Sequence, residues 1–330
     1  MNLRFDEVKD RSAWELFVVR HAPQSLFQSW LWGEVQRKLG LEVGRFGLYE
    51  GEALRGIAQT IRVPARRGSF LHVRHGPIID SLDPVLWVYV SDRLCEQAKR
   101  KDCLFVRISP LITQALPLRT VPSAIHRMDG EYCWVLDLDP SEDELLAGMR
   151  KSTRYDIRKA QKDGANVTAS TNPKLLSGFF SLYQETSTRH GFVPHTGIAE
   201  EFEIFAKERQ ATLYVGTYKG KTTAAAIILY FGHQAIYHHG ASVHSDTPVS
   251  ALVQWEAIRE AKKRGMKVYN FWGIAPDDSP NHPWRGITLF KKGFGGRVVK
   301  YLHAQDIPVS PLYLFPRIVE IARRKFRGYD

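Results

Sequence analysis

Ala235-Ile236-Tyr237-His238-His239-Gly240-Ala241-Ser242 is a mostly apolar run with the length typical of a buried β-strand. Residues 248–264 then predict a helix, and Lys267-Val268-Tyr269-Asn270-Phe271-Trp272 predicts a second buried strand. On the N-terminal side, residues 213–218 and 224–231 flank Gly220-Lys221, which indicates two strands joined by a tight turn. This half of the chain therefore predicts a hairpin, a strand, a helix and a strand, in that order.

The first half of the chain predicts the same order of elements. Residues 84–100 predict an amphipathic helix, because Leu86, Val90, Leu94 and Ala98 fall on one helical face. Strands are expected at residues 46–52, 53–63, 69–79 and 104–108, and two earlier helices at residues 11–20 and within 23–36.

The two halves repeat at a nearly constant offset. Gly51 and Gly220 lie 169 residues apart, and both His75–His239 and Cys103–Lys267 are separated by 164 residues. Such agreement over some sixty residues indicates an internal duplication, although common α/β patterns can also agree by chance.

Composition limits the class of protein. The chain has 330 residues, of which 44% are hydrophobic and 25% charged, as in an ordinary globular protein. The net charge of +11 favours an anionic partner: nucleic acid, a phosphorylated substrate or an acidic membrane surface. Three cysteines at unsuitable spacing predict no metal site and a reducing compartment. We find no signal peptide and no membrane-spanning run, so we expect a cytoplasmic protein.

Two basic segments are candidates for binding an anion. Within residues 149–164, Arg150, Arg154 and Arg158 fall on one helical face, which fits either a phosphate-binding ridge or a solvated helix. Residues 317–327 alternate apolar and basic side chains, which allows contact with a membrane surface but favours a helix packed on the protein.

A third candidate is Ile287-Thr288-Leu289-Phe290-Lys291-Lys292-Gly293-Phe294-Gly295-Gly296. Glycines allow positive φ angles and a close approach of the backbone to a ligand, and a neighbouring lysine can bind a phosphate or a carboxylate. The alternative interpretation is purely structural: a helix end, a glycine turn and a last strand.

The order of elements in each half resembles that of GNAT-type acyltransferases, in which two neighbouring parallel strands splay apart. This resemblance implies an α/β protein with mixed sheets and two tandem GNAT-like domains, with a cleft between or within them. We expect the first domain at residues 1–135, completed by 308–330, and the second at 136–307. Neither 80–84 nor 244–251 has the glycines of a coenzyme A phosphate loop, which argues for another acyl donor.

The chain also resembles the FemABX family of peptidoglycan interpeptide-bridge aminoacyltransferases. The matching segments are residues 151–160 with Gly164, 180–192, 236–242 with Gln254-Trp255, and Gly273-Ile274 followed by 290–296. The resemblance implies transfer of an amino acid from aminoacyl-tRNA to an amino group of a stem peptide. The spacing from Phe202 to Leu213 is too short for the long helical arm of some members, so we expect a compact member.

The resemblance also implies roles for individual residues. Lys291 is the expected catalytic residue, placed at the tRNA end of the substrate, with a plain surface lysine as the alternative. Gln36 and Arg37 stand where compact members have a lysine that helps to hold a nucleotide diphosphate, and His195 stands near a second phosphate-binding position. Ser109 occupies the place of an aspartate, so no general base is identified.

Further residues are expected to bind substrate. Arg189 and Arg154 are possible phosphate or carboxylate clamps, with structural ion pairing as the alternative. Tyr237 and His239 are expected to line the cleft, although His239 fits an ordinary strand histidine equally well, and Phe294 is expected at the cleft floor. Asp277-Asp278 lies in a proline-rich loop and favours a solvated turn over a metal pair.

Three functions therefore remain open. The favoured one is a monomeric aminoacyltransferase that uses aminoacyl-tRNA and no other cofactor, with UDP-N-acetylmuramoyl pentapeptide or lipid II as acceptor and possible contact with the inner membrane surface. The alternatives are a GNAT-fold N-acyltransferase with another donor, and a non-catalytic RNA-binding module. The sequence does not reveal the transferred amino acid or the accepting residue.

Overall fold

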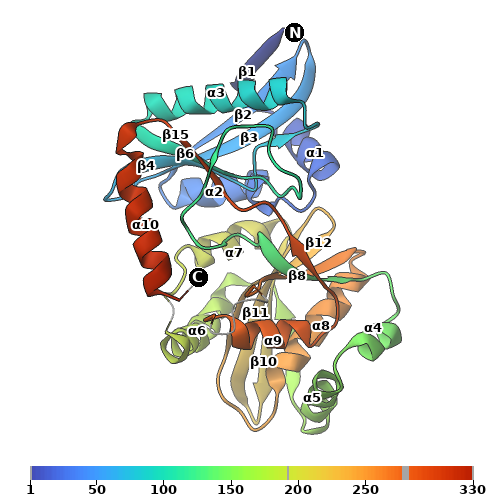
Figure 1. Cartoon of the computed structure of the whole chain (residues 1–330). Helices are drawn as coiled ribbons and strands as arrows, with labels where there is room; N and C mark the ends of the chain where they lie inside the picture. Colours follow the sequence, from blue (N-terminus) through green and yellow to red (C-terminus); the bar gives the residue numbers. More distant parts are fainter. Residues whose placement is uncertain (1, 192, 277–281, 329–330) are drawn as a thin grey trace. The chain divides into compact units, whose positions relative to one another are not determined.

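The computed structural model describes residues 2–191, 193–276 and 282–328. The chain forms two compact units, each built on its own sheet (Figure 1). The first unit comprises residues 1–132, 275–285 and 299–330, and the second comprises 133–274 and 286–298. The limits expected from the sequence, 1–135 with 308–330 and 136–307, remain a prediction about independently folding domains.

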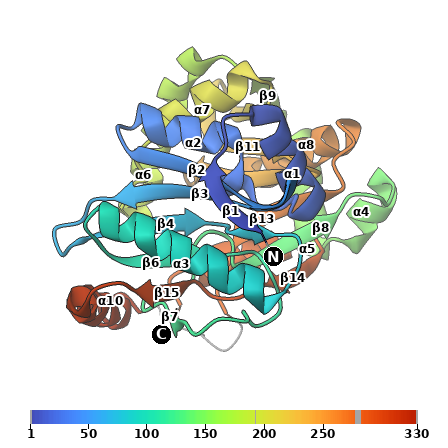
Figure 2. The ribbon, with the colours of Figure 1, turned by 90° about the horizontal axis from the view of Figure 1, so that it is seen from above.

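The first unit contains a mixed sheet with helices on both faces. The strands follow the order β1 (Leu3–Glu7), β2 (Glu42–Glu50), β3 (Ala53–Val63), β4 (Ser69–Arg74), β6 (Cys103–Ser109), β15 (Gln305–Pro308) and β7 (Val121–Pro122), and the short β5 (Ile78–Ile79) pairs with β3. Only β4 and β6 run parallel. Helix α3 (Pro84–Arg100) covers one face, while α1 (Arg11–His21) and α2 (Trp30–Lys38) lie on the other (Figure 2).

Local sequence explains where these helices begin. The side chain of Asp10 accepts hydrogen bonds from two amides of the first turn of α1, and Ser29 caps α2 in the same way. Asp83 caps α3, whose first residue, Pro84, needs no amide partner. The predicted apolar face of α3 then packs into the core with β4 and β6. The chain ends in α10 (Leu314–Phe326), which follows the short η3 (Pro311–Tyr313); η1 (Leu26–Gln28) precedes α2.

The second unit repeats this arrangement. Its strands follow the order β9 (Asn166–Ser170), β10 (Ala211–Tyr218), β11 (Lys221–Phe231), β12 (Gln234–Ser242), β13 (Val268–Gly273), β8 (Tyr132–Asp137) and β14 (Arg297–Lys300). Again the central pair, β12 and β13, is parallel, and α8 (Val249–Lys263) connects its two strands as α3 does in the first unit. The predicted fold class, with tandem GNAT-like halves, is confirmed.

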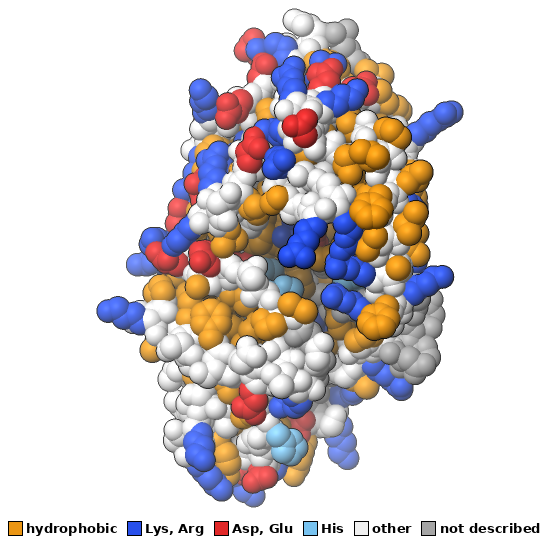
Figure 3. Space-filling view, turned by 90° about the vertical axis from the view of Figure 1, so that its left-hand side faces the viewer, with side chains coloured by type: hydrophobic (Ala, Val, Ile, Leu, Met, Phe, Trp, Pro, Cys, Tyr) orange, Lys and Arg blue, Asp and Glu red, His pale blue; other side chains and the backbone are white. Residues whose placement is uncertain are grey.

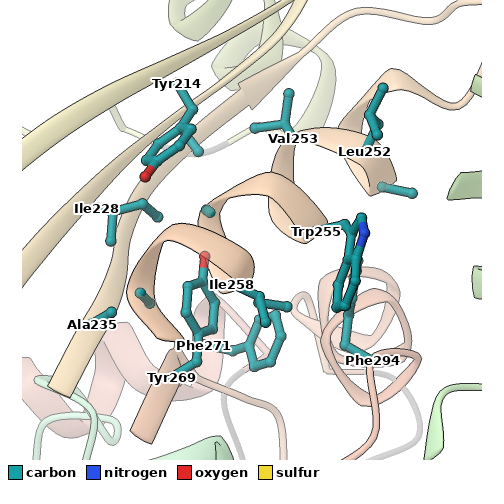
Figure 4. Close-up of a cluster of buried hydrophobic side chains, with 14 of the residues drawn as sticks. Tyr214, Ile228, Ala235, Leu252, Val253, Trp255, Ile258, Tyr269, Phe271 and Phe294 are labelled. Atoms are coloured by element: carbon teal, nitrogen blue, oxygen red, sulfur yellow. The ribbon is translucent and has the colours of Figure 1, made fainter. Parts of the chain in front are cut away.

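The core of the second unit lies between its sheet and α8. Alternate residues of β11 belong to this core: Ala224, Ala226, Ile228 and Tyr230. Figure 4 shows Ile228 with the core residues Trp255, Tyr269, Phe271 and Phe294. The intervening residues of β11 are buried as well, because α6 (Leu176–His190) packs on the opposite face. The remaining helices are α4 (Glu142–Gly148), α5 (Lys151–Lys162), α7 (Ile198–Lys207), α9 (Arg285–Lys292) and the short η2 (Pro173–Leu175).

Candidate active site

The parallel pairing of β12 with β13 stops partway along the two strands. It joins Gln234–Ile236 to Val268–Asn270 and goes no further. Beyond that point β12 remains on β11 as far as Ser242, whereas β13 ends against β8 with Gly273 opposite Cys133. The strands thus part as the GNAT resemblance implies, and the residues after the parting have no backbone partner on the other strand.

A β-bulge at the parting places two histidines beside one carboxylate. Ile227 pairs with His239 and Ile228 with Tyr237, so that His238 is an extra residue in β12. Neighbouring side chains of a regular strand point to opposite faces, but here both imidazoles face Glu201 of α7. Glu201 Oε1 lies 2.9 Å from His238 Nδ1 and 3.2 Å from His239 Nε2.

The charges of this cluster are defined by its burial and by its hydrogen bonds. Burial alone would raise the pKa of Glu201, but the two facing histidines lower it well below its ordinary value. Burial and the neighbouring His238 lower the pKa of His239. An ionised carboxylate only accepts hydrogen bonds, so both nitrogens that face Glu201 carry protons. In the neutral imidazole of His239 the lone pair therefore sits on Nδ1, the nitrogen that can accept a proton.

The same three side chains have the composition of a metal site. Their donor atoms lie within 4.8 Å of one another, and two histidines with one carboxylate are common zinc ligands. Hydrogen bonds already satisfy these atoms in the protein itself, so no metal is required to explain the cluster. The expectation of no resident metal remains a prediction.

Backbone strain marks the other side of the parting. Trp272 has φ +67°, which is unfavourable for a bulky residue, and its amide donates to Asn270 Oδ1 at 2.8 Å. Its indole ring lies 5.1 Å from the His238 imidazole, nearly perpendicular to it. Such strain is typical of functional sites, where surrounding contacts hold the backbone in place.

Lys291 lies on α9, buried within the second unit, and is not the surface lysine of the alternative interpretation. Its Nζ donates to the carbonyl oxygen of Gly273 at 2.5 Å, and its side chain is 7% exposed. Among the described residues no carboxylate forms an ion pair with it. Burial lowers the pKa of Lys291 to about 7, so that the ammonium group sits close to its titration point at neutral pH.

The glycines after Lys291 are required by tight packing. Gly295 and Gly296 both have positive φ, and a Cβ atom on Gly296 would lie 2.2 Å from the carbonyl oxygen of Val135. The stretch is thus a helix end, a glycine turn and a strand, as the structural interpretation predicted. A functional role for Lys291 within this stretch remains a prediction.

Arg189 lies in a separate pocket of the second unit. Its Nη2 donates to Ser242 O at 2.7 Å, and the pocket, of about 300 Å³, is also lined by Thr223 and by residues 242–245 and 247–250. No side chain caps α8, which begins here, and the buried Thr223 Oγ1 has no hydrogen-bond partner in the described part of the chain. A helix N-terminus, an arginine and an unsatisfied hydroxyl are suited to a phosphate.

Three other residues that were expected to bind substrate lie in different surroundings. His195 is exposed, and its ring lies 5.8 Å from that of His239. Tyr237 is half-buried, and a Cβ atom on Gly240 would lie 1.8 Å from its hydroxyl oxygen, so the phenol covers this glycine. Phe294 is fully buried against Phe271 and packs in the core, and its expected place at the cleft floor stays a prediction.

The basic segment forms α5, and its cations divide into exposed ones, such as Arg158 and Lys162, and ones held by other groups of the protein. Arg154 donates to the carbonyl oxygens of Ala147 and Met149 at 2.9 and 2.6 Å, and Arg150 donates to Leu289 O at 2.6 Å. Lys159 pairs with Asp163. These contacts favour the structural interpretation of Arg154; its role as a clamp remains a prediction. Phe192, Asp277 and Asp278 lie outside the described residues.

The first-unit candidates lie on α2. Gln36 is buried, and Arg37 donates to Glu34 at 3.1 Å. Ser109 is engaged structurally, because its Oγ accepts from the amide of His75 at 3.1 Å. His75, the counterpart of His239, is buried with its Nε2 2.7 Å from Asp129 O.

Glu201 was missed by sequence reasoning, although a signal was present. It follows Ile198 by three residues and precedes Phe205 by four, which places a carboxylate on the apolar face of a helix. A charged residue in such a position is buried only when it is paired.

Comparison with known proteins now identifies the family. A sequence model of the FemAB family matches residues 10–127, 121–198 and 195–320. The chain belongs to the FemAB family. This membership confirms the resemblance found in the sequence and the expected class of enzyme, the aminoacyltransferases.

Similar proteins span much or all of the chain. A lipid II:glycine glycyltransferase of Staphylococcus haemolyticus is 20% identical over 91% of this chain and 92% of its own length. A UDP-N-acetylmuramoylpentapeptide-lysine N(6)-alanyltransferase of Weissella viridescens is 25% identical over 57% of this chain and 50% of its own. The crystal structure of FemX superimposes with a TM-score of 0.82 at 17% identity, over 96% of this chain and all of that one, which shows the shared fold.

The short connection between α7 and β10 agrees with the expectation of a compact member. Helix α7 ends at Lys207 and β10 begins at Ala211, which leaves no room for a helical arm. Among the described residues, no helix has both the length and the apolar character that crossing a bilayer demands.

Proposed function

We propose that this protein transfers an amino acid from aminoacyl-tRNA to an amino group on the stem peptide of a peptidoglycan precursor, either UDP-N-acetylmuramoyl pentapeptide or lipid II. The observation that carries the proposal is the buried Lys291 ammonium group where β12 and β13 part, which pairs with no carboxylate of the described residues. Family membership and the named activities of the two relatives support it. The donor and a nucleotide-linked acceptor are both cytoplasmic molecules, so the proposed reaction takes place in the cytoplasm.

The reaction replaces an ester by an amide. The acceptor nitrogen attacks the ester carbonyl carbon, the bond from that carbon to the ribose oxygen breaks, and the tRNA hydroxyl leaves with one proton. A lysine-type amine has a pKa of about 10.4 and must first lose a proton to become a nucleophile. No covalent intermediate is needed, because the ester is already activated and correct alignment lowers the barrier.

In the proposed mechanism His239 accepts the proton of the acceptor amine. Its lone pair is on Nδ1, and the ionised Glu201 carboxylate at 3.2 Å from Nε2 stabilises the imidazolium that forms. This arrangement supplies the general base that the sequence, with Ser109 in place of an aspartate, did not reveal.

Lys291 provides positive charge for the donor end of the substrate. In the protein alone its only polar contact among the described hydrogen bonds is the Gly273 carbonyl oxygen. A developing oxyanion or the terminal phosphate of the tRNA is a stronger hydrogen-bond acceptor than a carbonyl oxygen. The hydrogen bond of the ammonium group therefore strengthens as the reaction proceeds, which stabilises the transition state. The pocket of Arg189 and the α8 N-terminus is proposed to bind a second phosphate of the donor.

The test combines the purified protein with a pool of labelled aminoacyl-tRNAs and, in separate reactions, with UDP-N-acetylmuramoyl pentapeptide or lipid II. The expected result is a labelled muropeptide from at least one acceptor. Absence of labelled product with every amino acid and both acceptors would contradict the proposal. Transfer from acetyl-coenzyme A instead would support the alternative N-acyltransferase, and binding of charged tRNA without turnover would support an RNA-binding module.

A further inference from the structure

The C-terminal helix α10 has apolar side chains that are turned away from the protein. Phe315, Ile318, Ala322 and Phe326 are spaced by three and four residues, so they lie along one side of the helix, and all are exposed. Leu312 and Leu314, at its beginning, are 66% and 63% exposed, and Phe326 is 93% exposed. An amphipathic helix on a globular protein normally buries its apolar side, and here that side faces solvent.

Buried ion pairs fix this orientation. Arg107 of β6 donates to Asp306 at 2.7 and 2.9 Å, and to Glu320 of α10 at 3.1 and 2.8 Å. Tyr313 also donates to Asp306, at 2.9 Å. Because Arg107 is almost fully buried and binds Glu320, the side of α10 that carries Glu320 and the buried Pro316 is held against the sheet. The exposed apolar side is therefore a consequence of the native packing.

A basic groove lies beside this apolar side, within the first unit. It has a volume of about 290 Å³ and an apolar floor that includes Phe70 and Phe105. Five arginines line it: Arg66, Arg67, Arg323, Arg324 and Arg327. Its carboxylate, Glu320, already pairs with Arg107, so the groove carries net positive charge. Burial and the nearby Arg327 lower the pKa of His126, which also lines the groove, to about 4.

We propose that α10 and this groove dock the protein on an anionic phospholipid bilayer. The arginines would bind lipid phosphates, and the apolar side of α10 would enter the interface between headgroups and acyl chains. Figure 3 shows this face, where Lys and Arg side chains gather next to exposed hydrophobic ones. The aliphatic character of Leu312, Leu314 and Ile318 favours a bilayer over RNA, whose binding surfaces use polar and aromatic groups. The positive charge disfavours a second copy of the chain, which would bring like charges together.

The experiment measures co-sedimentation of the full-length protein with vesicles of phosphatidylcholine alone or mixed with phosphatidylglycerol. We expect binding to the anionic vesicles only, weakened by salt. The double variants Phe315→Ser/Ile318→Ser and Arg323→Gln/Arg327→Gln should each reduce binding about tenfold or more. Matched controls are Leu16→Ser, an exposed apolar residue of α1, and Lys263→Gln, an exposed cation at the end of α8; both should bind normally.

Three results would overturn the proposal. One is equal sedimentation with neutral and anionic vesicles. Another is normal vesicle binding by both double variants, with circular dichroism showing that they are folded. The third is that the wild type binds no vesicles but forms a dimer, or a complex with uncharged tRNA, and that the double variants do not. Transfer to the soluble UDP-linked acceptor should be unchanged in all these variants, which separates this proposal from the proposed enzymatic activity.

Discussion

The parallel strand pairs at the centre of the two sheets end differently. In the first unit β4 pairs with β6 as far as Arg74 and Ser109. One more backbone hydrogen bond, from the Ser109 amide to Gly76 O, extends this contact beyond the end of β4. In the second unit the pairing of β12 with β13 stops after Ile236 and Asn270. The same topology thus yields one closed and one open strand pair.

The buried polar groups follow this difference. In the first unit the half-buried Arg74 and the buried Arg107 pair with the carboxylates of Asp129 and Asp306. In the second unit the buried Lys291 has a carbonyl oxygen as its partner. Paired charges stabilise a closed structure, whereas a buried cation with a weak acceptor is ready to bind an anion. This difference agrees with the proposed function, which assigns the chemistry to the second unit.

The largest expected effect concerns the titration of Lys291. Its pKa in the folded protein is about 7, against 10.5 in the unfolded chain, so between these values the unfolded state binds more protons and stability rises with pH. The full shift corresponds to about 5 kcal/mol, of which about 3.5 kcal/mol falls between pH 7 and pH 10. Urea denaturation should show that the wild type becomes more stable relative to Lys291→Met as the pH rises from 7 to 10. We expect the difference between their free energies of unfolding to change by about 3.5 kcal/mol. Parallel pH profiles of the two proteins would show that Lys291 is not a buried, unpaired cation.

The next effect distinguishes the glycines of the two units. A Cβ atom on Gly296 would meet the backbone of Val135, whereas Gly51, in the turn between β2 and β3 of the first unit, has positive φ but open space around it. We expect Gly296→Ala to reduce the free energy of unfolding by about 3 kcal/mol or more and Gly51→Ala by about 1 kcal/mol. Equal losses in chemical denaturation would rule out the close approach at Gly296.

The equivalent histidines offer a direct exchange of roles. His239→Asn should reduce the rate of transfer about a hundredfold and remove the acidic limb of the pH–rate profile, because the proposed base is inactive when protonated. His75→Asn should instead reduce stability by about 2 kcal/mol through its lost bond to Asp129 O, with transfer by the folded protein unchanged. A normal pH–rate profile for His239→Asn would assign both histidines to structure.

The smallest expected effect is on donor binding. Arg189→Gln should raise KM for aminoacyl-tRNA about tenfold with little change in kcat, because a phosphate contact contributes equally to ground and transition states. Arg158→Gln, an exposed arginine of α5, is the matched control and should leave KM unchanged. If Arg189→Gln left KM unaltered as well, the pocket at α8 would not be a donor site.

The sequence predicted most of the fold because its signals are local. Helix α3 has the predicted limits Pro84–Arg100. A capping aspartate precedes it, a proline is its first residue, and apolar residues recur every four positions along it. Strand β15 was not predicted: it is four residues long, and its pairing with β6 involves residues about two hundred positions away. No local pattern encodes such a contact.

The candidate site was predictable only in part, for a similar reason. Lys291 was found through its motif, but its burial and its carbonyl partner depend on where α9 packs against β13. The Glu201 cluster depends on a bulge at His238, and a bulge changes the direction of side chains without a reliable sequence signal. Arg154 is a residue type suited to clamping a phosphate, but its hydrogen bonds go to carbonyl oxygens at the end of α4. Only the structure reveals these contacts.

The central claim is that the open strand pair of the second unit carries the reaction through Lys291. The most direct test compares Lys291→Met with Lys292→Met, its neighbour on α9, in the transfer assay with labelled aminoacyl-tRNA. We expect Lys291→Met to lose transfer by at least about a hundredfold while it stays folded, and Lys292→Met to retain transfer. Wild-type turnover by a folded Lys291→Met would contradict the account.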